Sequence, residues 1–144
     1  MKQELLYIWQ LPQNFIGFIK SRFWRCKKKA HLTNEQLMYI KRIEKNQDVK
    51  IYVICDDCSH TTISGSSMGK YICVRLRDIT FTHDIPHEYG HCIQSMWLGW
   101  FYLIVIGLPS VAGNIYCRII NDWSNYFKLP WEKQADRLGG VVRE

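Results

Sequence analysis

The length, composition and charge of the chain place it among folded, single-domain proteins. Its 144 residues suit one domain, and a hydrophobic content of 47% with 14% aromatic residues excludes an intrinsically disordered chain. Six cysteines are too few for a disulfide-stapled miniprotein, and the first residues lack the basic start and small-residue cleavage site of a signal peptide. We therefore expect reduced cysteines and a protein that is cytoplasmic or peripherally attached to a membrane.

Residues 1–30 form an N-terminal segment that is first apolar and then basic. Residues 5–19 are interrupted by Pro12 and are fewer than the roughly 20 that cross a bilayer, so they predict an interfacial or core-packing helix. A basic cluster follows, made of Lys20, Arg22, Arg25, Lys27, Lys28 and Lys29. This cluster suits an anionic membrane surface, and a solvated basic face is the simpler alternative. Nucleic acid is disfavoured because no nucleic-acid-binding motif accompanies the cluster.

Residues 33–75 predict one helix followed by two strands. Thr33 and Gln36 form a capping box, and apolar residues at helical spacing predict an amphipathic helix that ends near Asn46. Residues 50–55 and 70–75 are short runs of β-branched and aromatic residues, separated by a stretch rich in Ser, Thr and Gly. We expect these two runs to pair as a small antiparallel sheet.

Cys55 and Cys58, in the connection after the first predicted strand, have the CxxC spacing of many zinc and redox sites. A structural zinc site needs two further ligands, and the sequence contains no second CxxC pair. We expect a loop-bound pair with a structural or redox-silent role. A disulfide or a metal role is the alternative.

Residues 92–117 contain no charged side chain, and the densest apolar part of this stretch is 97–112. Gly99, Gly107 and Pro109 divide that part, which argues against one straight helix across a membrane. Three interpretations stay open: burial in the core, contact with or partial insertion into a membrane, and a full transmembrane span.

The sequence HEYGH, from His87 to His91, fits the pattern HExxH. Pro86 predicts that a helix begins near Ile85, because proline is tolerated in the first turn of a helix. The two histidines then lie one turn apart on the same face, where both can bind one ion. Glu88 projects toward the same open side, where a carboxylate can take a proton from a metal-bound water. His87 and His91 are therefore candidate zinc ligands, and Glu88 is the candidate general base.

A catalytic zinc site of this kind takes a carboxylate as its third ligand and keeps the fourth position for water. Residues 131–138 predict a short helix that Gly139 and Gly140 terminate. Glu132 and Asp136 are four residues apart and so share one face of this helix. We expect Glu132 to bind the metal and Asp136 to accept a hydrogen bond from a ligand histidine.

The motif HEYGH and the motif EKQADR, 41 residues after His91, resemble the HExxH and ExxAD arrangement of gluzincin metallopeptidases. The resemblance is in particular to the CAAX prenyl-protease-like group and its minimal single-domain relatives, and residues 69–141 also resemble a group of small bacterial proteins. It implies a zincin-like fold, zinc as cofactor, peptide-bond hydrolysis, Glu132 as third ligand and Asp136 beside it. The larger relatives carry several spanning helices, whereas this chain has one ambiguous apolar segment.

The other histidines have simpler interpretations than metal binding. His83 lies four residues before the motif, but Pro86 should place it outside the helix, so we expect a surface or substrate-side role. His31 and His60 are expected in exposed loops. The alternative for the motif itself, two structural histidines, would require both acidic partners to be accidental.

Three further residues near the motif are expected to pack rather than to react. Gly90 weakens a helix by roughly 1 kcal/mol relative to alanine, which indicates a close approach of another backbone beneath the site. Tyr71 and Tyr89 are candidate oxyanion donors, but aromatic packing is the favoured role for both.

Together these observations predict an α+β, zincin-like single domain, with residues 31–144 forming the metallopeptidase domain. The motif helix should pack beneath the sheet, and the strand at residues 71–75 should form the edge of a cleft where an extended peptide or protein substrate adds as a further strand. Zinc-activated water, with Glu88 as general base, would hydrolyse the peptide bond. The main alternative is a non-catalytic zincin-like module whose metal stabilises a scaffold for a membrane or protein partner. A toxin or immunity-type partner is a third, without positive support.

Overall fold

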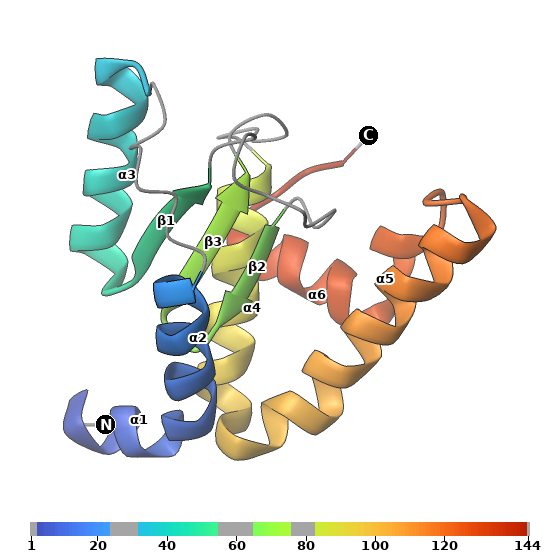
Figure 1. The fold of residues 1–144 in the computed structure, drawn as a ribbon, viewed down its shortest axis with the longest axis horizontal. Coiled ribbons are helices and arrows are strands. Elements are labelled where there is room, and N and C mark those ends of the chain that lie inside the picture. The colour runs from blue at the N-terminus through green and yellow to red at the C-terminus, as the bar shows by residue number, and fades with distance from the viewer. Residues whose placement is uncertain (1–2, 24–31, 55–64, 76–82, 144) are drawn as a thin grey trace.

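The computed structural model describes residues 3–23, 32–54, 65–75 and 83–143, and it shows a helical protein with one small sheet (Figure 1). The elements are α1 (Gln3–Trp9), α2 (Leu11–Phe23), α3 (Asn34–Gln47), β1 (Lys50–Ile54), β2 (Gly65–Met68), β3 (Tyr71–Arg75), α4 (Asp84–Leu98), the short helices η2 (Gly99–Phe101) and η3 (Leu103–Gly107), α5 (Leu108–Ile120), η4 (Tyr126–Lys128) and α6 (Pro130–Gly139). The predicted α+β class is confirmed. The CxxC pair, His31, His60 and the basic residues 25–29 lie outside the described residues.

The sheet is mixed, so the predicted antiparallel pairing of its first and last strands is wrong. Its strand order is β1-β3-β2, with β1 parallel to β3 and β2 antiparallel to β3. Lys50 pairs with Tyr71 at one end of the parallel register, and Ile54 pairs with Arg75 at the other. The physical reason is the additional strand β2, which reverses the chain before β3 through a turn at Gly69, where φ is +59°.

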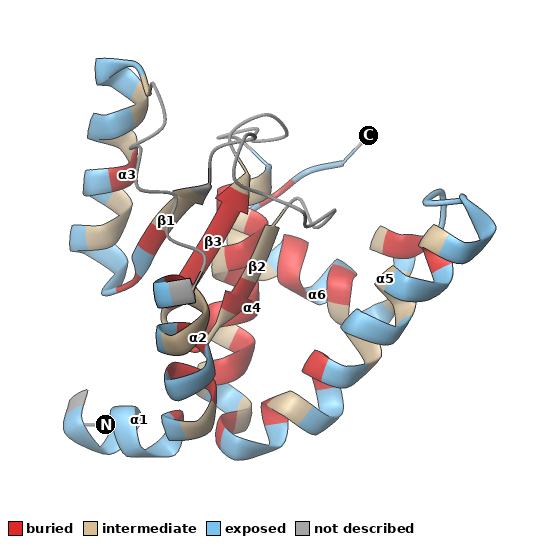
Figure 2. Cartoon of the chain, in the orientation of Figure 1, coloured by how far each residue is buried: buried red, intermediate tan, exposed pale blue. Residues whose placement is uncertain are grey.

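The central strand β3 is covered on both faces, because α2 and α4 pack on opposite sides of the sheet. Ile72 and Val74 share a buried cluster with Ile85 of α4. Tyr71, which points to the other face, contacts Phe18 of α2. The predicted position of the motif helix beneath the sheet is therefore confirmed (Figures 1 and 2). The predicted edge position of the strand 71–75 is wrong, since the strand beside α4 with an unpaired side in the described residues is β2.

Local signals placed most helix ends correctly. The side chain of Thr33 accepts a hydrogen bond from the backbone N–H of Gln36, and the Gln36 side chain accepts one from the Thr33 backbone, which completes the predicted capping box. α4 begins at Asp84, one residue before the predicted start, and α6 ends at Gly139 with Gly140 in the left-handed conformation.

Glycines allow α4 and α6 to cross with their backbones in contact. A β-carbon at Gly90 would lie 2.0 Å from the carbonyl oxygen of Ala135, and one at Gly139 would lie 2.0 Å from that of Pro86. The predicted packing role of Gly90 is confirmed. This close crossing brings the face of α6 that carries its acidic residues directly over the histidines of α4.

The apolar segment 97–112 is not a buried core segment. Trp97, Trp100, Ile104 and Leu108 are each more than half exposed, and Figure 2 shows exposed residues alternating with buried ones along the turn from α4 into α5. Leu103–Ile120 is the one helical stretch in the described part of the chain that is long and apolar enough to cross a membrane, and 11% of it is buried inside the protein.

Candidate metal centre

Three side chains that are distant in the sequence converge between α4 and α6. His87 and His91 come from successive turns of α4, Glu132 comes from the first turn of α6, and all three are buried. Oε2 of Glu132 lies 3.1 Å from Nε2 of His87 and 3.2 Å from Nε2 of His91. The three potential ligand atoms lie within 4.8 Å of one another, so this group could hold a metal ion.

The spacing between the Glu132 carboxylate oxygen and each histidine nitrogen is close to that of ligands around a tetrahedral ion. Ligands at about 2.0–2.1 Å from a tetrahedral centre are about 3.3–3.4 Å apart. The measured separations of 3.1 and 3.2 Å between the carboxylate oxygen and the two ring nitrogens are close to that value. Each residue offers a donor atom of the right chemical type for such an ion, within 4.8 Å of the other two.

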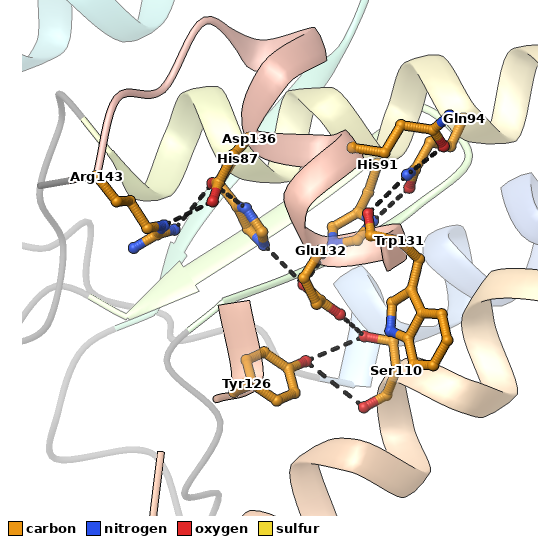
Figure 3. A network of polar contacts seen from close by, with 10 residues as sticks. His87, His91, Gln94, Ser110, Tyr126, Trp131, Glu132, Asp136 and Arg143 are labelled. Atoms are coloured by element: carbon orange, nitrogen blue, oxygen red, sulfur yellow. Dashed lines mark hydrogen bonds and ion pairs between the residues drawn. The ribbon is translucent and has the colours of Figure 1, made fainter. Parts of the chain in front are cut away.

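Asp136 contacts the ring of His87. Its Oδ1 lies 2.8 Å from Nδ1 of His87, which directs the other ring nitrogen toward Glu132 (Figure 3). Arg143 holds the same carboxylate by donating to Oδ2 at 2.7 Å and to Oδ1 at 3.1 Å. The guanidinium of Arg143 also lies 3.6 Å from the centre of the Phe127 ring, which keeps it in place.

Gln94 performs the same task for the second histidine. It follows His91 by three residues on the same face of α4, and its Oε1 lies 2.7 Å from Nδ1 of His91. Its Nε2 donates to the backbone oxygen of Trp131 at 2.8 Å. This amide therefore links the orientation of the histidine to the start of α6, the helix that carries Glu132.

The two carboxylate oxygens of Glu132 contact different partners. While Oε2 faces the histidines, Oε1 accepts a hydrogen bond from the hydroxyl of Ser110 on α5 (Figure 3). The Ser110 hydroxyl lies 3.0 Å from the hydroxyl of Tyr126 in η4. The carboxylate is thus fixed by a helix that does not carry any of the three ligands.

The electrostatics of the group are those of a site that favours a positive charge. Burial opposes a charge on His87, but its hydrogen bond with Glu132 and the charge of Glu88 raise the pKa of the ring to about 9. Burial also opposes a charge on Glu132, yet its bonds with His87 and His91 lower the pKa of its carboxyl. A bound cation would take the place of the proton that these groups share.

Glu88 is buried and lies beside the edge strand β2. A β-carbon at Gly65, the first residue of β2, would come within 2.7 Å of Oε1 of Glu88, so a larger residue there would displace the end of the Glu88 side chain from its present position. Lys20 of α2 donates to the hydroxyl of Ser66 on the same strand, and burial lowers the pKa of its ammonium group. Glu88 therefore lies beside a strand that also contacts the half-buried ammonium group of Lys20.

The remaining predicted candidates lie outside the metal centre. Tyr71 stacks on Tyr52 and packs against α2, which confirms its packing role. The hydroxyl of Tyr89 donates to Gln47 of α3. His83 precedes α4 and is exposed, as expected from Pro86. None of these side chains belongs to the group of three that could hold a metal ion.

Sequence reasoning missed four residues that support the site. Gln94 could have been found from its spacing, since it lies three residues after His91 and so on the same helix face. Ser110, Arg143 and Gly65 had no local signal, because their contacts depend on how α5, the C-terminal segment and β2 are placed in space.

Comparison of the chain with family models, with curated proteins and with solved structures finds no match. The resemblance to gluzincins therefore stays a prediction from two motifs, and the case for function depends on the geometry of the metal centre.

Proposed function

We propose that the protein is a zinc-dependent peptidase in which His87, His91 and Glu132 bind the ion and Glu88 is the general base. The observation that carries the proposal is the convergence of two imidazoles on one oxygen of a buried carboxylate, at 3.1 and 3.2 Å, with each ring held by an acceptor on its other nitrogen. Two nitrogen ligands and one carboxylate form a donor set typical of catalytic zinc. Asp136 and Gln94 supply the orientation that such ligands need.

The number of ligands favours catalysis over a structural role. Structural zinc sites are closed by four protein ligands, whereas catalytic sites have three and keep one position open. In the described part of the chain, the candidate metal centre has three potential ligands, His87, His91 and Glu132. A structural site would also have no use for the buried carboxylate of Glu88, which occupies the space left by Gly65.

Each residue then has a defined task in hydrolysis. When bound, zinc supplies a Lewis acid and lowers the pKa of a coordinated water. Glu88 would accept a proton from the attacking water and pass it to the leaving amine. Lys20, placed beside β2, supplies a positive charge near the same edge.

An extended peptide is the substrate that this edge fits best. Among the described residues β2 is an edge strand, and it begins at Gly65, beside Glu88, so a peptide that paired with it would place its backbone next to the base. The strand that would pair with the substrate is therefore β2, and not β3 as the sequence predicted.

Two substitutions test the assignment. Glu132→Ala should lose bound zinc, measured as metal content of the purified protein, because it removes a ligand. Glu88→Gln should keep about one zinc per chain and lose hydrolysis of a peptide library followed by mass spectrometry. Glu35→Gln, the same change at an exposed position of α3, is the matched control and should retain both.

The outcomes separate the two functional classes. If Glu88→Gln hydrolyses peptides as fast as the unmodified protein, the mechanism is wrong. If the unmodified protein binds one zinc and cleaves no member of the library, the non-catalytic scaffold is the better assignment.

A further inference from the structure

Exposed apolar side chains gather where α4 turns into α5. We name residues 97–108 at this turn the apolar elbow, in which Trp97, Trp100, Phe101, Ile104, Val105 and Leu108 are each between 51% and 66% exposed. The exposed apolar surface continues along α5 and onto α1, where Leu5 and Ile8 are more than half exposed. Water-soluble domains rarely leave so large a continuous apolar surface without a partner.

Hydrogen bonds at the base of the elbow tie it to α1 and the start of α2. The indole N–H of Trp100 donates to the backbone oxygen of Ile8 at 3.1 Å, and that of Trp9 donates to the backbone oxygen of Met96 at 3.1 Å. The amide of Gln10 donates to Ser95 at 2.9 Å. These bonds fasten α1 and the start of α2 to the elbow. They also leave its outer surface to the apolar parts of the rings, as contact with a medium that offers no hydrogen bonds requires.

The length and composition of the adjoining helix suit hydrocarbon. Leu103–Ile120 has a mean hydropathy of 1.7 and is 11% buried, whereas a core helix of similar composition would be mostly buried. Eighteen residues of helix extend about 27 Å, close to the roughly 30 Å of a bilayer core. An interface with a protein would have a polar rim, but no charged residue occurs from Cys92 to Cys117.

The charged residues lie at the opposite ends of the same helices. α2 and α5 both run away from the elbow (Figure 1). Lys20 and Arg22 occupy the last turn of α2, and Arg118 occupies the last turn of α5. The exposed aromatic residues Tyr116 and Trp123 flank Arg118, as aromatic residues do at the level of lipid headgroups. α1, beside the elbow, carries a single charged residue, Glu4, in its first turn.

We propose that the apolar elbow, with the exposed faces of α1 and α5, inserts into a phospholipid bilayer. The elbow is the deepest part, and the basic ends of α2 and α5 lie at the level of anionic headgroups. This inference concerns where the protein works, and it holds whether or not the metal centre hydrolyses peptides.

Flotation of the full-length protein with vesicles tests the insertion. The vesicles contain phosphatidylcholine mixed with phosphatidylglycerol. The protein should float with them and stay bound in high salt, because salt screens charges but does not weaken apolar contacts. The double variant Ile104→Glu, Leu108→Glu should reduce the bound fraction at least tenfold. Met38→Glu, a matched change at an equally exposed apolar residue of α3, should bind as the unmodified protein does. Zinc content and circular dichroism verify that each variant is folded.

Fluorescence provides an independent measurement on the unmodified protein, which decides the matter even if the double variant fails to fold. Vesicles brominated on their acyl chains should quench the tryptophan emission, because Trp97 and Trp100 would then lie among the chains. Absence of quenching, complete release by salt, or unchanged flotation of a folded double variant would each overturn the proposal. So would a stable dimer in solution that does not bind vesicles and that the double variant dissociates, since a second copy would then cover the elbow.

Discussion

Replacing Gly90 by alanine should damage the metal centre, although alanine is the better helix former. The added β-carbon would lie 2.0 Å from the carbonyl oxygen of Ala135 and 2.6 Å from its carbonyl carbon, whereas ordinary contact begins at 3.4 Å. Because the obstruction is backbone, no side-chain rotation relieves it. α4 and α6 must therefore separate by about 1.4 Å at this point, which is the difference between 3.4 and 2.0 Å.

The expected effect on stability combines a gain in helix propensity with a cost of overpacking, and the expected effect on zinc binding depends on how far the ligand distances can change. In an unobstructed helix the change would stabilise by about 1 kcal/mol, and overpacking costs about 1–3 kcal/mol, so we expect a lower unfolding temperature. Metal sites tolerate about 0.2 Å in ligand distance. Glu132 lies less than one turn from Ala135 on α6, so the separation of the helices would carry its carboxylate out of range. We expect zinc affinity to fall at least tenfold.

The measurement is competition for zinc with a chelating dye, combined with thermal unfolding followed by circular dichroism. Gly107→Ala is the matched control, because a β-carbon there meets no atom closer than 3.7 Å. It should bind zinc normally and unfold at the same temperature or higher. If Gly90→Ala behaves like Gly107→Ala in both measurements, the close crossing of α4 and α6 is not what holds the centre together.

Two other predictions concern the base and the proton. Gly65→Ala should push the Glu88 carboxylate aside, so zinc content should stay the same while peptide hydrolysis slows at least tenfold; an unchanged rate would contradict the placement of Glu88. In chelator-stripped protein the pKa of His87 is raised from 6.5 to about 9, so its contribution to stability is full below pH 6.5 and is lost as the pH rises to about 9. Zinc must displace that proton, so the zinc-induced increase in unfolding temperature should grow over the same interval, and a flat response would refute the coupling.

The three residues of the candidate metal centre could be predicted from the sequence because their signals are local. A proline fixed the start of α4, the i, i+4 spacing put both histidines on one face, and two glycines ended the helix that carries Glu132. What holds the ligands could not be predicted in the same way. Ser110 and Arg143 reach the site only through the tertiary placement of their segments.

The sheet and the apolar segment show two different limits of sequence reasoning. β2 has the sequence GSSM, which has the composition of a turn, so its pairing with β3 is decided by tertiary contacts and the parallel arrangement of β1 and β3 was missed. The composition of residues 97–112 suits a protein core and a lipid phase equally, because both environments select apolar side chains. Only the exposure of those side chains in the folded chain distinguishes the two.

The hydrogen bond from Ser110 to Glu132 has a thermodynamic consequence, because Ser110 belongs to the same helix that presents the exposed apolar surface. A shift of α5 on entering lipid would change how firmly the carboxylate is positioned for the cation. Linkage is reciprocal, so occupancy by the cation must then alter partitioning into the lipid by the same factor. Attachment to lipid and retention of the ion would thus become two measures of one equilibrium.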